Sequence, residues 1–177
     1  METESTKQEL SWPANANHPG DAGVTSKVST GSPAVAGDDN RGIVQLARTW
    51  IGTPYVHQAS LKGVGCDCLG LLRGVWRELR GGEPEDIPPY TPDWDLRGRE
   101  AMRDGFARHL AAVPLKEISP GDVVLFRMVG RAPAKHCAVV GERDGGLTLI
   151  HARQNKRVSE EAFTASWRRK LAYAFRL

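Results

Sequence analysis

The residues in this sequence best suited to chemistry are two cysteines and two histidines. Cys66 and Cys68 stand one residue apart in "GVGCDCLGLLRGVW", after two glycines and before apolar residues at helical spacing. A cysteine in the first turn of a helix lies at the positive end of the helix dipole, which lowers its pKa and favours the nucleophilic thiolate. The unpaired backbone N–H groups of that turn can stabilise an oxyanion. Cys68 is therefore a candidate nucleophile, although most free cysteines are simply small buried side chains.

The two histidines lie on strands that a short turn can bring together. His136 opens "HCAVVGE" and His151 follows "LTLI", with Asp144-Gly145 between them as the turn. A two-residue turn pairs position 136 with 153 and 138 with 151, which puts both histidines on one face, one diagonal step apart. A three-residue loop would move His151 to the other face. The same-face arrangement makes His136 a general base and His151 its orienting partner, as in thiol hydrolases.

Metal binding is the competing interpretation of the cysteines. A zinc site built from Cys66, Cys68, His136 and Cys137 lacks the C-x2-C spacing common in structural sites, so it is the less favoured alternative. The i, i+2 spacing of Cys66 and Cys68 would strain a disulfide between them. We expect Cys66 to line the entrance of the site and Cys137, which alternates away from His136, to lie in the core. The chemistry requires no metal and no other cofactor.

The helices needed to position these residues are expected in the first two thirds of the chain. Residues 1–40 are rich in Ser, Thr, Gly, Pro and Ala and have no apolar periodicity, which predicts a disordered or docking tail before a domain at 41–177. A helix capped by Asp39 or Asn40 is expected to close at Gly52, with the apolar stripe Ile43, Val44, Ala47, Trp50 and Ile51. Further helices are predicted at 68–80, capped by Asp67, and near 96–112.

The last third of the chain has the pattern of strands. After the turn residues "SPGD", we expect strands over 123–129, 136–142, 147–153 and 170–177. Helices followed by an antiparallel sheet predict an α+β fold, with the helices packed on one side of the sheet.

Charge and hydropathy exclude some functions. The net charge of +3 is uneven, because residues 1–40 hold six acids and two lysines, whereas residues 151–177 hold seven Arg or Lys and two Glu. A basic patch often binds nucleic acid, but aromatic residues are scarce and no nucleic-acid motif is present, so we expect no nucleic-acid partner. No apolar run reaches 18 residues and the first residues lack the layout of a signal peptide. The expectation is a protein made in the cytoplasm, without a membrane span.

Several motifs in fixed order resemble the NlpC/P60 family of papain-like cysteine peptidases, in particular its phage-borne cell-wall peptidases, including those of gene transfer agents. The motifs are "LARTWIGTPYVHQAS", "GVGCDCLGLLRGVW", "ISPGDVVLF" and "KHCAVVGE" followed by "LIHAR", and the resemblance covers about residues 41–177. It implies Cys68 as nucleophile, His136 as general base and His151 as the third polar residue. It also implies that Tyr55 lies near the thiol and assists the oxyanion.

At some other positions around the implied site, the sequence differs from the usual pattern of the family. Asp67 matches the acid that precedes the family's cysteine, where helix capping is the plain physical role. The family usually has Ser or Thr after the cysteine, where this chain has Leu69, and an aromatic residue and glycines after the tyrosine, where it has "VHQA". These departures concern the groove. His57 could contact substrate or be a solvated loop residue.

The resemblance implies a peptidase that cuts peptidoglycan stem peptides between D-glutamate and a diamino acid. The implied partners are peptidoglycan and the tail-tip or baseplate proteins of a phage-like particle, with residues 1–40 as a docking arm. Two alternatives stay open. One is a catalytically silent tail-tip protein that binds glycan or a neighbouring protein, and the other is a thiol acyltransferase or amidase on the same fold.

Overall fold

The computed structural model describes residues 36–91 and 98–177 of the chain. The predicted tail at 1–40 therefore lies outside the described residues, apart from its last five, which begin a helix. That helix, α1, spans Ala36–Arg48, so it starts before the predicted cap at Asp39 or Asn40. Contacts within the chain place the described residues in one unit.

The end of α1 differs from the predicted end at Gly52. After Arg48 the backbone tightens, because the N–H of Trp50 donates to the carbonyl of Ala47 and that of Ile51 to the carbonyl of Arg48. The stripe of Ile43, Val44, Ala47 and Trp50 is buried as predicted. The tighter turn rotates Ile51 away from the stripe, and its side chain is 45% exposed, so its assignment to the core was wrong.

α2 spans Cys68–Arg80 and agrees with the prediction. A small hairpin of β1 (Ser60–Leu61) and β2 (Gly65–Cys66) precedes it. The helix ends where Gly81 takes a left-handed φ of 81° and donates its N–H to the carbonyl of Arg77. At Gly74, α2 packs against Trp50 in the turn that follows α1, where a Cβ atom on Gly74 would lie 2.0 Å from the ring.

The main sheet has six antiparallel strands in the order β3-β8-β4-β5-β6-β7. Their bounds are β3 Ala111–Ala112, β4 Val123–Phe126, β5 His136–Arg143, β6 Gly146–His151, β7 Ser159–Ala162 and β8 Leu171–Arg176. The remaining helices are α3 (Ala101–His109), the 3-10 turn η2 (Leu115–Glu117) and α4 (Ala165–Arg168). The helix predicted near 96–112 was too long, because the chain passes into β3 at Ala111. β7 was not predicted.

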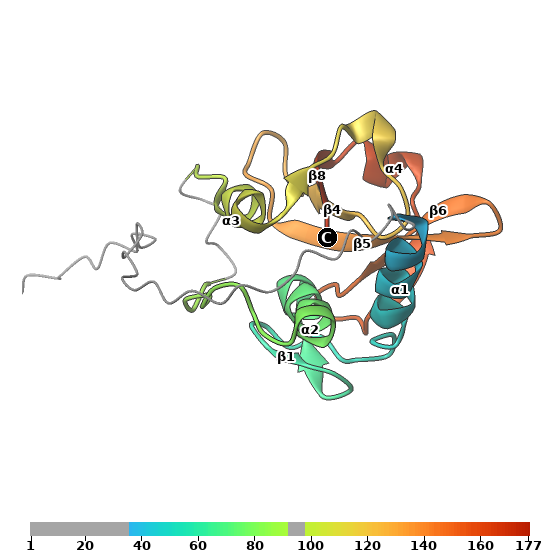
Figure 1. The fold of residues 1–177 in the computed structure, drawn as a ribbon. Helices are drawn as coiled ribbons and strands as arrows, with labels where there is room; N and C mark the ends of the chain where they lie inside the picture. Colours follow the sequence, from blue (N-terminus) through green and yellow to red (C-terminus); the bar gives the residue numbers. More distant parts are fainter. Residues whose placement is uncertain (1–35, 92–97) are drawn as a thin grey trace, which may run out of the picture. The chain divides into compact units, whose positions relative to one another are not determined.

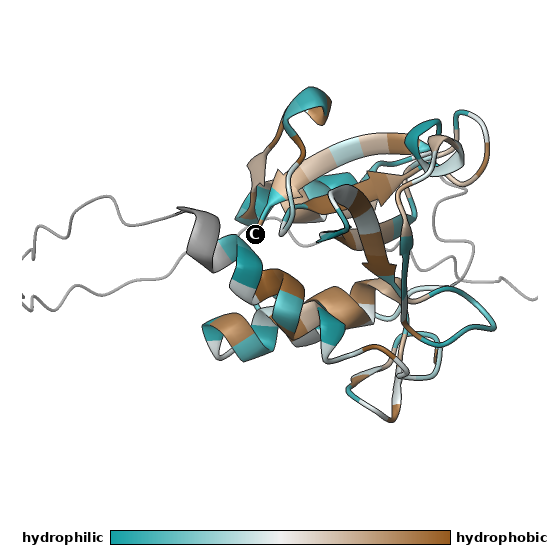
Figure 2. Cartoon of the chain, turned by 90° about the vertical axis from the view of Figure 1, so that its right-hand side faces the viewer, coloured by the Kyte–Doolittle hydropathy of each residue, from teal (hydrophilic) through white to brown (hydrophobic). Residues whose placement is uncertain are grey.

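Each face of the sheet has its own apolar cluster. On one face, Leu125, Val139 and Ile150 pack with residues of α1, α2 and α3. On the other face, Phe126 and Leu149 pack with residues that include Trp167 of α4. Figure 1 shows α1 and α2 on one side of β5 and α4 on the other, and in Figure 2 the central strands are mostly brown. The α+β class, with the first three helices on one side of an antiparallel sheet, is confirmed.

Candidate active site

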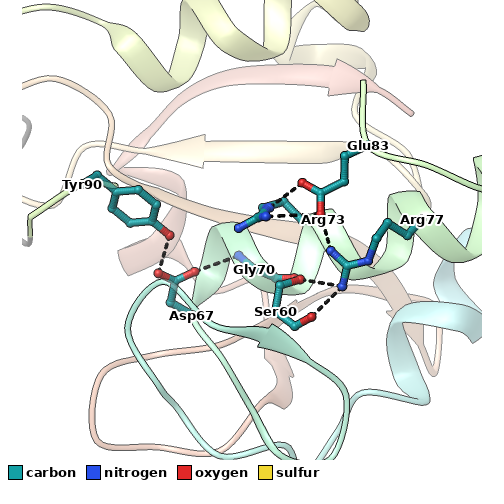
Figure 3. A network of polar contacts seen from close by, with 7 residues as sticks. All are labelled: Ser60, Asp67, Gly70, Arg73, Arg77, Glu83 and Tyr90. Atoms are coloured by element: carbon teal, nitrogen blue, oxygen red, sulfur yellow. Dashed lines mark hydrogen bonds and ion pairs between the residues drawn. The ribbon is translucent and has the colours of Figure 1, made fainter. Parts of the chain in front are cut away.

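The start of α2 is held by the buried carboxylate of Asp67. Its Oδ1 accepts the N–H of Gly70 at 2.7 Å, which caps the helix. Its Oδ2 accepts the N–H of Gln58 at 2.8 Å and the hydroxyl of Tyr90 at 2.5 Å (Figure 3). Asp67 is 2% exposed, and both of its oxygens are used inside the protein. Asp67 caps the helix, and a contact of Asp67 with substrate stays a prediction.

A second polar network supports the side of α2 behind the cap. Arg77 donates to the carbonyl of Ser60 at 2.5 Å and to its hydroxyl oxygen at 2.9 Å, while the Ser60 hydroxyl donates to the carbonyl of Gly70 at 2.5 Å. Glu83 accepts from Arg73 at 2.6 Å and also from Arg77 (Figure 3). The network joins β1, α2 and the segment after α2, so the first turn of the helix is fixed on two sides.

His57 packs against the same anchor. Its Nε2 lies 3.0 Å from the carbonyl oxygen of Tyr90, its ring meets the Tyr90 ring edge-on, and its Nδ1 lies 3.6 Å from Oδ2 of Asp67. One third of the side chain is exposed. These contacts give His57 a part in holding the segment around Tyr90, and a contact with substrate stays a prediction.

The two histidines meet as the predicted register requires. β5 and β6 pair Val139 with Ile150, and Asp144 and Gly145 form the turn with φ values of 52° and 74°. His136 and His151 therefore project from one face, and Nε2 of His136 lies 2.9 Å from Nδ1 of His151. Only a two-residue or four-residue connection permits this contact.

Cys68 approaches this pair from the opposite side of the sheet. Its Sγ lies 4.0 Å from the carbonyl oxygen of Lys135, the residue before β5, so the candidate nucleophile and the candidate base meet where that strand begins. A hydrogen bond with Cys137, and the hydrogen bond and positive charge of His136, hold the pKa of the Cys68 thiol well below its usual range. Burial and the negative charge of Asp67 oppose this effect. The site therefore favours a thiolate at Cys68.

The family assignment follows from a comparison of the whole sequence with family models. Residues 52–176 match the NlpC/P60 family. The chain belongs to this family. No curated protein sequence matches it significantly.

Solved structures of NlpC/P60 proteins share this fold. The NlpC/P60 domain of the peptidoglycan hydrolase SagA has a TM-score of 0.51 at 24% identity over 78% of this chain and 98% of its own. An NlpC/P60 family protein from Bacillus cereus has a TM-score of 0.55 at 21% identity, over 77% of this chain and 39% of its own. NlpC2 from Trichomonas vaginalis has a TM-score of 0.54 at 22% identity, over 78% of this chain and 46% of its own. The chain thus spans less than half of two of these proteins.

Tyr55, which the NlpC/P60 resemblance places near the thiol, bridges to Cys66 in the backbone and is half-buried. Burial, followed by the negative charges of Asp67 and Cys68, raises the pKa of Tyr55 to about 12. The phenol therefore stays protonated at neutral pH and can donate a hydrogen bond. With Pro54 and the loop residues 155–157 it lines a pocket of about 220 Å³.

The other two cysteines are buried in the apolar core. Cys66 is 0% exposed, so the expectation that it lines the entrance was wrong. Burial, and then the charges of Asp67 and Cys68, raises the pKa of its thiol to about 12. Cys137 lies in the core as predicted, but its contact with the Cys68 sulfur was not foreseen. All three cysteines are free. Among the described residues, no three His, Cys, Asp or Glu side chains are grouped as a metal ion would require.

Where this chain departs from the family pattern, the structure shows local packing. Leu69 is half-buried and packs against the core beside Cys68. Val56 is 46% exposed, and its side chain fills the space next to Gly65, where a Cβ atom would lie 2.5 Å from it. Leu69 follows Cys68 in α2, and Val56 lies in the segment before β1.

Two residues of the site were missed by sequence reasoning. Glu161 of β7 accepts hydrogen bonds from Nε2 of His151 at 3.0 Å and from the indole N–H of Trp167 at 2.9 Å. The Trp167 ring stacks on His136 with a centroid distance of 5.6 Å. The segment "SEEA" has no apolar alternation, so nothing local predicted a strand there. The pairing of Glu161 opposite Leu149, which aims it at His151, exists only in the assembled sheet.

Proposed function

We propose that this chain is a cysteine endopeptidase that cuts the stem peptides of peptidoglycan, between D-glutamate and the diamino acid. The observation that carries the proposal is the Cys68 thiol, with its pKa lowered, at the first turn of α2 and beside a His136 that is held by His151. The family supports the same class of reaction, since SagA, whose NlpC/P60 domain shares this fold, is a peptidoglycan hydrolase.

The proposed reaction has two steps. The Cys68 thiolate attacks the carbonyl carbon of the amide, and the N–H of Cys68 and the phenol of Tyr55 stabilise the oxyanion. His136 gives its proton to the leaving amine, which departs and leaves a thioester. His136 then takes a proton from water, the hydroxide attacks the thioester, and the acid and the thiolate are released. The excess of Arg and Lys over residues 151–177 would favour a polymer with carboxylates.

Digestion of purified sacculi, followed by mass spectrometry of the released fragments, tests this function. The wild type should release fragments cut at the D-glutamyl bond, and Cys68→Ala should lower the rate at least about 1,000-fold, because the nucleophile is lost. Cys66→Ala is the matched control, since that buried thiol has a raised pKa and takes no part in the reaction.

Each other result has a definite meaning. Background release from both the wild type and Cys68→Ala would leave a silent structural protein as the better description. Fragments that carry a transferred acyl group would identify an acyltransferase, and a cut elsewhere would identify a peptidase or amidase of different bond specificity.

We also propose that the protein is made in the cytoplasm and reaches the cell wall in a phage-like tail, with residues 1–40 as a docking arm on a tail-tip or baseplate protein. The support is the composition of that segment, which is polar, small-residue rich and acidic, as is common in segments that order on a partner. Co-expression with tail components and mass spectrometry of purified particles tests this proposal. Particles that contain the full chain but lose it when residues 1–34 are deleted would support it, and particles that never contain the chain would contradict it.

Among the helices of residues 36–91 and 98–177, none is both long and apolar enough to cross a bilayer.

A further inference from the structure

We propose that Glu161 is a positioning residue that fixes the tautomers of both histidines and so presents Nδ1 of His136 to the Cys68 thiol. This inference rests on the proposed function and extends the site beyond the nucleophile, base and third residue that the family resemblance implies. It makes the site a relay of four side chains from α2, β5, β6 and β7, ending at the carboxylate of an edge strand.

Glu161 is in contact with the ring of His151. Oε1 of Glu161 lies 3.0 Å from Nε2 of His151. An ionised carboxylate only accepts hydrogen bonds, so this nitrogen must carry the proton. A neutral imidazole has a single N–H, and Nδ1 of His151 is therefore an acceptor.

The tautomer of His151 also determines the tautomer of His136. Its Nε2 lies 2.9 Å from Nδ1 of His151, which can only accept, so Nε2 of His136 must be the donor. The remaining nitrogen, Nδ1 of His136, is then free to take the proton of Cys68. With the opposite tautomer at His151, a lone pair would face the carboxylate, and Nε2 of His136 would have to accept from Nδ1 of His151. The proton of His136 would then lie on its Nδ1, which could no longer take a proton from Cys68, so one carboxylate selects both tautomers.

Burial also decides which residues of the relay carry a charge. His151 is fully buried, and burial, followed by the charges of His136, Arg153 and Lys156, lowers its pKa to about 3. His151 therefore stays neutral while His136 gains and loses its proton. The anion that balances a protonated His136 along this line is Glu161, whose side chain is one third exposed.

Charged and polar groups from several elements surround His151 and Glu161. His136 comes from β5, and Arg153 and Lys156 come from the loop between β6 and β7. Arg153 lies 3.3 Å from Oε1 of Glu161, and α4 contributes the uncharged Trp167, whose indole N–H donates to the same oxygen. Arg153 and Trp167 hold the carboxylate in place, and they are also the basis of a purely structural alternative, in which Glu161 only anchors α4.

Two substitutions separate the tautomeric role from the charge. In Glu161→Gln the side-chain carbonyl can still accept from His151, so the tautomer is kept and the charge is lost. In Glu161→Ala both are lost. Nitrogen-15 NMR of the histidine rings reports the tautomer, and the rate of Cys68 alkylation by iodoacetamide against pH reports the thiolate. Neither measurement needs a peptidoglycan substrate.

The expected results differ between the variants. The wild type and Glu161→Gln should show the Nε2–H form of His151, and Glu161→Ala should show a mixture that includes the Nδ1–H form. The midpoint of Cys68 alkylation should rise in both variants and more in Glu161→Ala, because a protonated His136 is less stabilised. Turnover should fall about 10- to 100-fold in Glu161→Ala, as for carboxylates that orient metal-bound histidines, with less than a twofold change in KM.

Glu160→Gln is the matched control. Glu160 is the neighbour of Glu161 on the opposite face of β7, where it pairs with Arg48 and Arg143. Its substitution should lower thermal stability but leave the tautomers and the alkylation midpoint unchanged. If Glu161→Ala fails to fold, the raised midpoint of Glu161→Gln still tests the charge.

Wild-type tautomers and alkylation midpoints in both Glu161 variants would overturn the proposal and leave Glu161 as an anchor of Trp167. A protein that shows the expected tautomers but releases nothing from sacculi would contradict the proposed function and leave the relay standing. The two failures are therefore distinguishable.

Discussion

His151 is the clearest case of a side chain whose protonation is decided by its surroundings. Its pKa is lowered to about 3 from an ordinary value of 6.5, chiefly because the ring is buried. Between these two pH values the unfolded chain binds a proton at His151 and the folded protein does not. Stability contributed by this group is thus present above pH 6.5 and is lost progressively as the pH falls towards 3.

This linkage gives a prediction for urea denaturation. Between pH 7 and pH 5 the wild type should lose about 2 kcal/mol of unfolding free energy through His151 alone, from a shift of this size at about 1.4 kcal/mol per unit. His151→Asn has no titrating ring at this position. Its unfolding free energy should therefore fall by about 2 kcal/mol less than that of the wild type between pH 7 and pH 5. This difference does not depend on the stability of the variant at pH 7. An equal loss in the two proteins would mean that His151 titrates normally when folded.

The sulfur of Cys68 depends in the same way on neighbours from different elements. Cys137 and His136 favour the thiolate, and Asp67 opposes it. Cys137 itself stays protonated, because burial and then the nearby Cys68 raise its pKa well above the usual range. The Cys137 thiol can donate to the Cys68 sulfur because α2 packs on β5. The spacing of these residues in the sequence does not predict this contact.

At the scale of elements, the N-terminus of α2 combines two opposed effects of one residue. The carboxylate of Asp67 caps the helix and fixes Gln58 and Tyr90, which stabilises the segment that carries Cys68. The same negative charge raises the pKa of Cys68. Asp67 thus stabilises the structure around α2 and at the same time lowers the fraction of Cys68 that is ionised.

Asp67→Asn should separate these effects. The unfolding free energy should fall by about 1–3 kcal/mol, because an amide cannot accept all three hydrogen bonds that the carboxylate accepts. The alkylation midpoint of Cys68 should move to lower pH, because the opposing charge is gone. Urea denaturation and iodoacetamide titration measure the two changes.

Glu83→Gln is the control for this prediction. It weakens the contacts with Arg73 and Arg77, so it should lower stability without moving the alkylation midpoint. An upward shift of the midpoint in Asp67→Asn would show that the geometry of the helix start outweighs the charge of the cap.

At the scale of the whole molecule, the relative placement of α1 and α2 depends on a close approach. A Cβ atom on Gly74 would lie 2.0 Å from the Trp50 ring, which is buried between the helices and the sheet. The indole N–H of Trp50 also donates to Glu78 of α2 at 2.9 Å, so the ring has little freedom to move aside. The close approach of α2 to the Trp50 ring therefore depends on the missing side chain at position 74.

Gly74→Ala should therefore destabilise the protein by about 1–3 kcal/mol, as other overpacked cores do. The same substitution at Gly42 in α1, where nothing lies within 4 Å of the added Cβ, should stabilise it by about 0.5–1 kcal/mol. Urea denaturation of both variants gives the comparison. A Gly74→Ala protein as stable as the wild type would show that α1 can shift on α2 without loss.

The sequence by itself determined the features that depend on neighbours along the chain. The apolar stripe of α2, the cap at Asp67 and the turn at Asp144-Gly145 are local, and the alternation of β5 and β6 then requires His136 and His151 to share a face. The candidate nucleophile and the contact between the two histidines could be predicted for this reason. The boundaries of α1 and α3 were less accurate, because helix ends depend on hydrogen bonds outside the helix, as at Ile51.

Only the tertiary structure decided the features that join distant segments. Glu161 reaches His151 because β7 pairs with β6, Trp167 stacks on His136 because α4 returns to that face, and Cys137 meets Cys68 because α2 crosses β5. Tyr90 reaches Asp67 across 23 residues, through a loop without periodicity. Hydrophobic periodicity and secondary-structure propensity depend only on residues that are close in the sequence. Contacts between helices and strands depend instead on how the whole core packs.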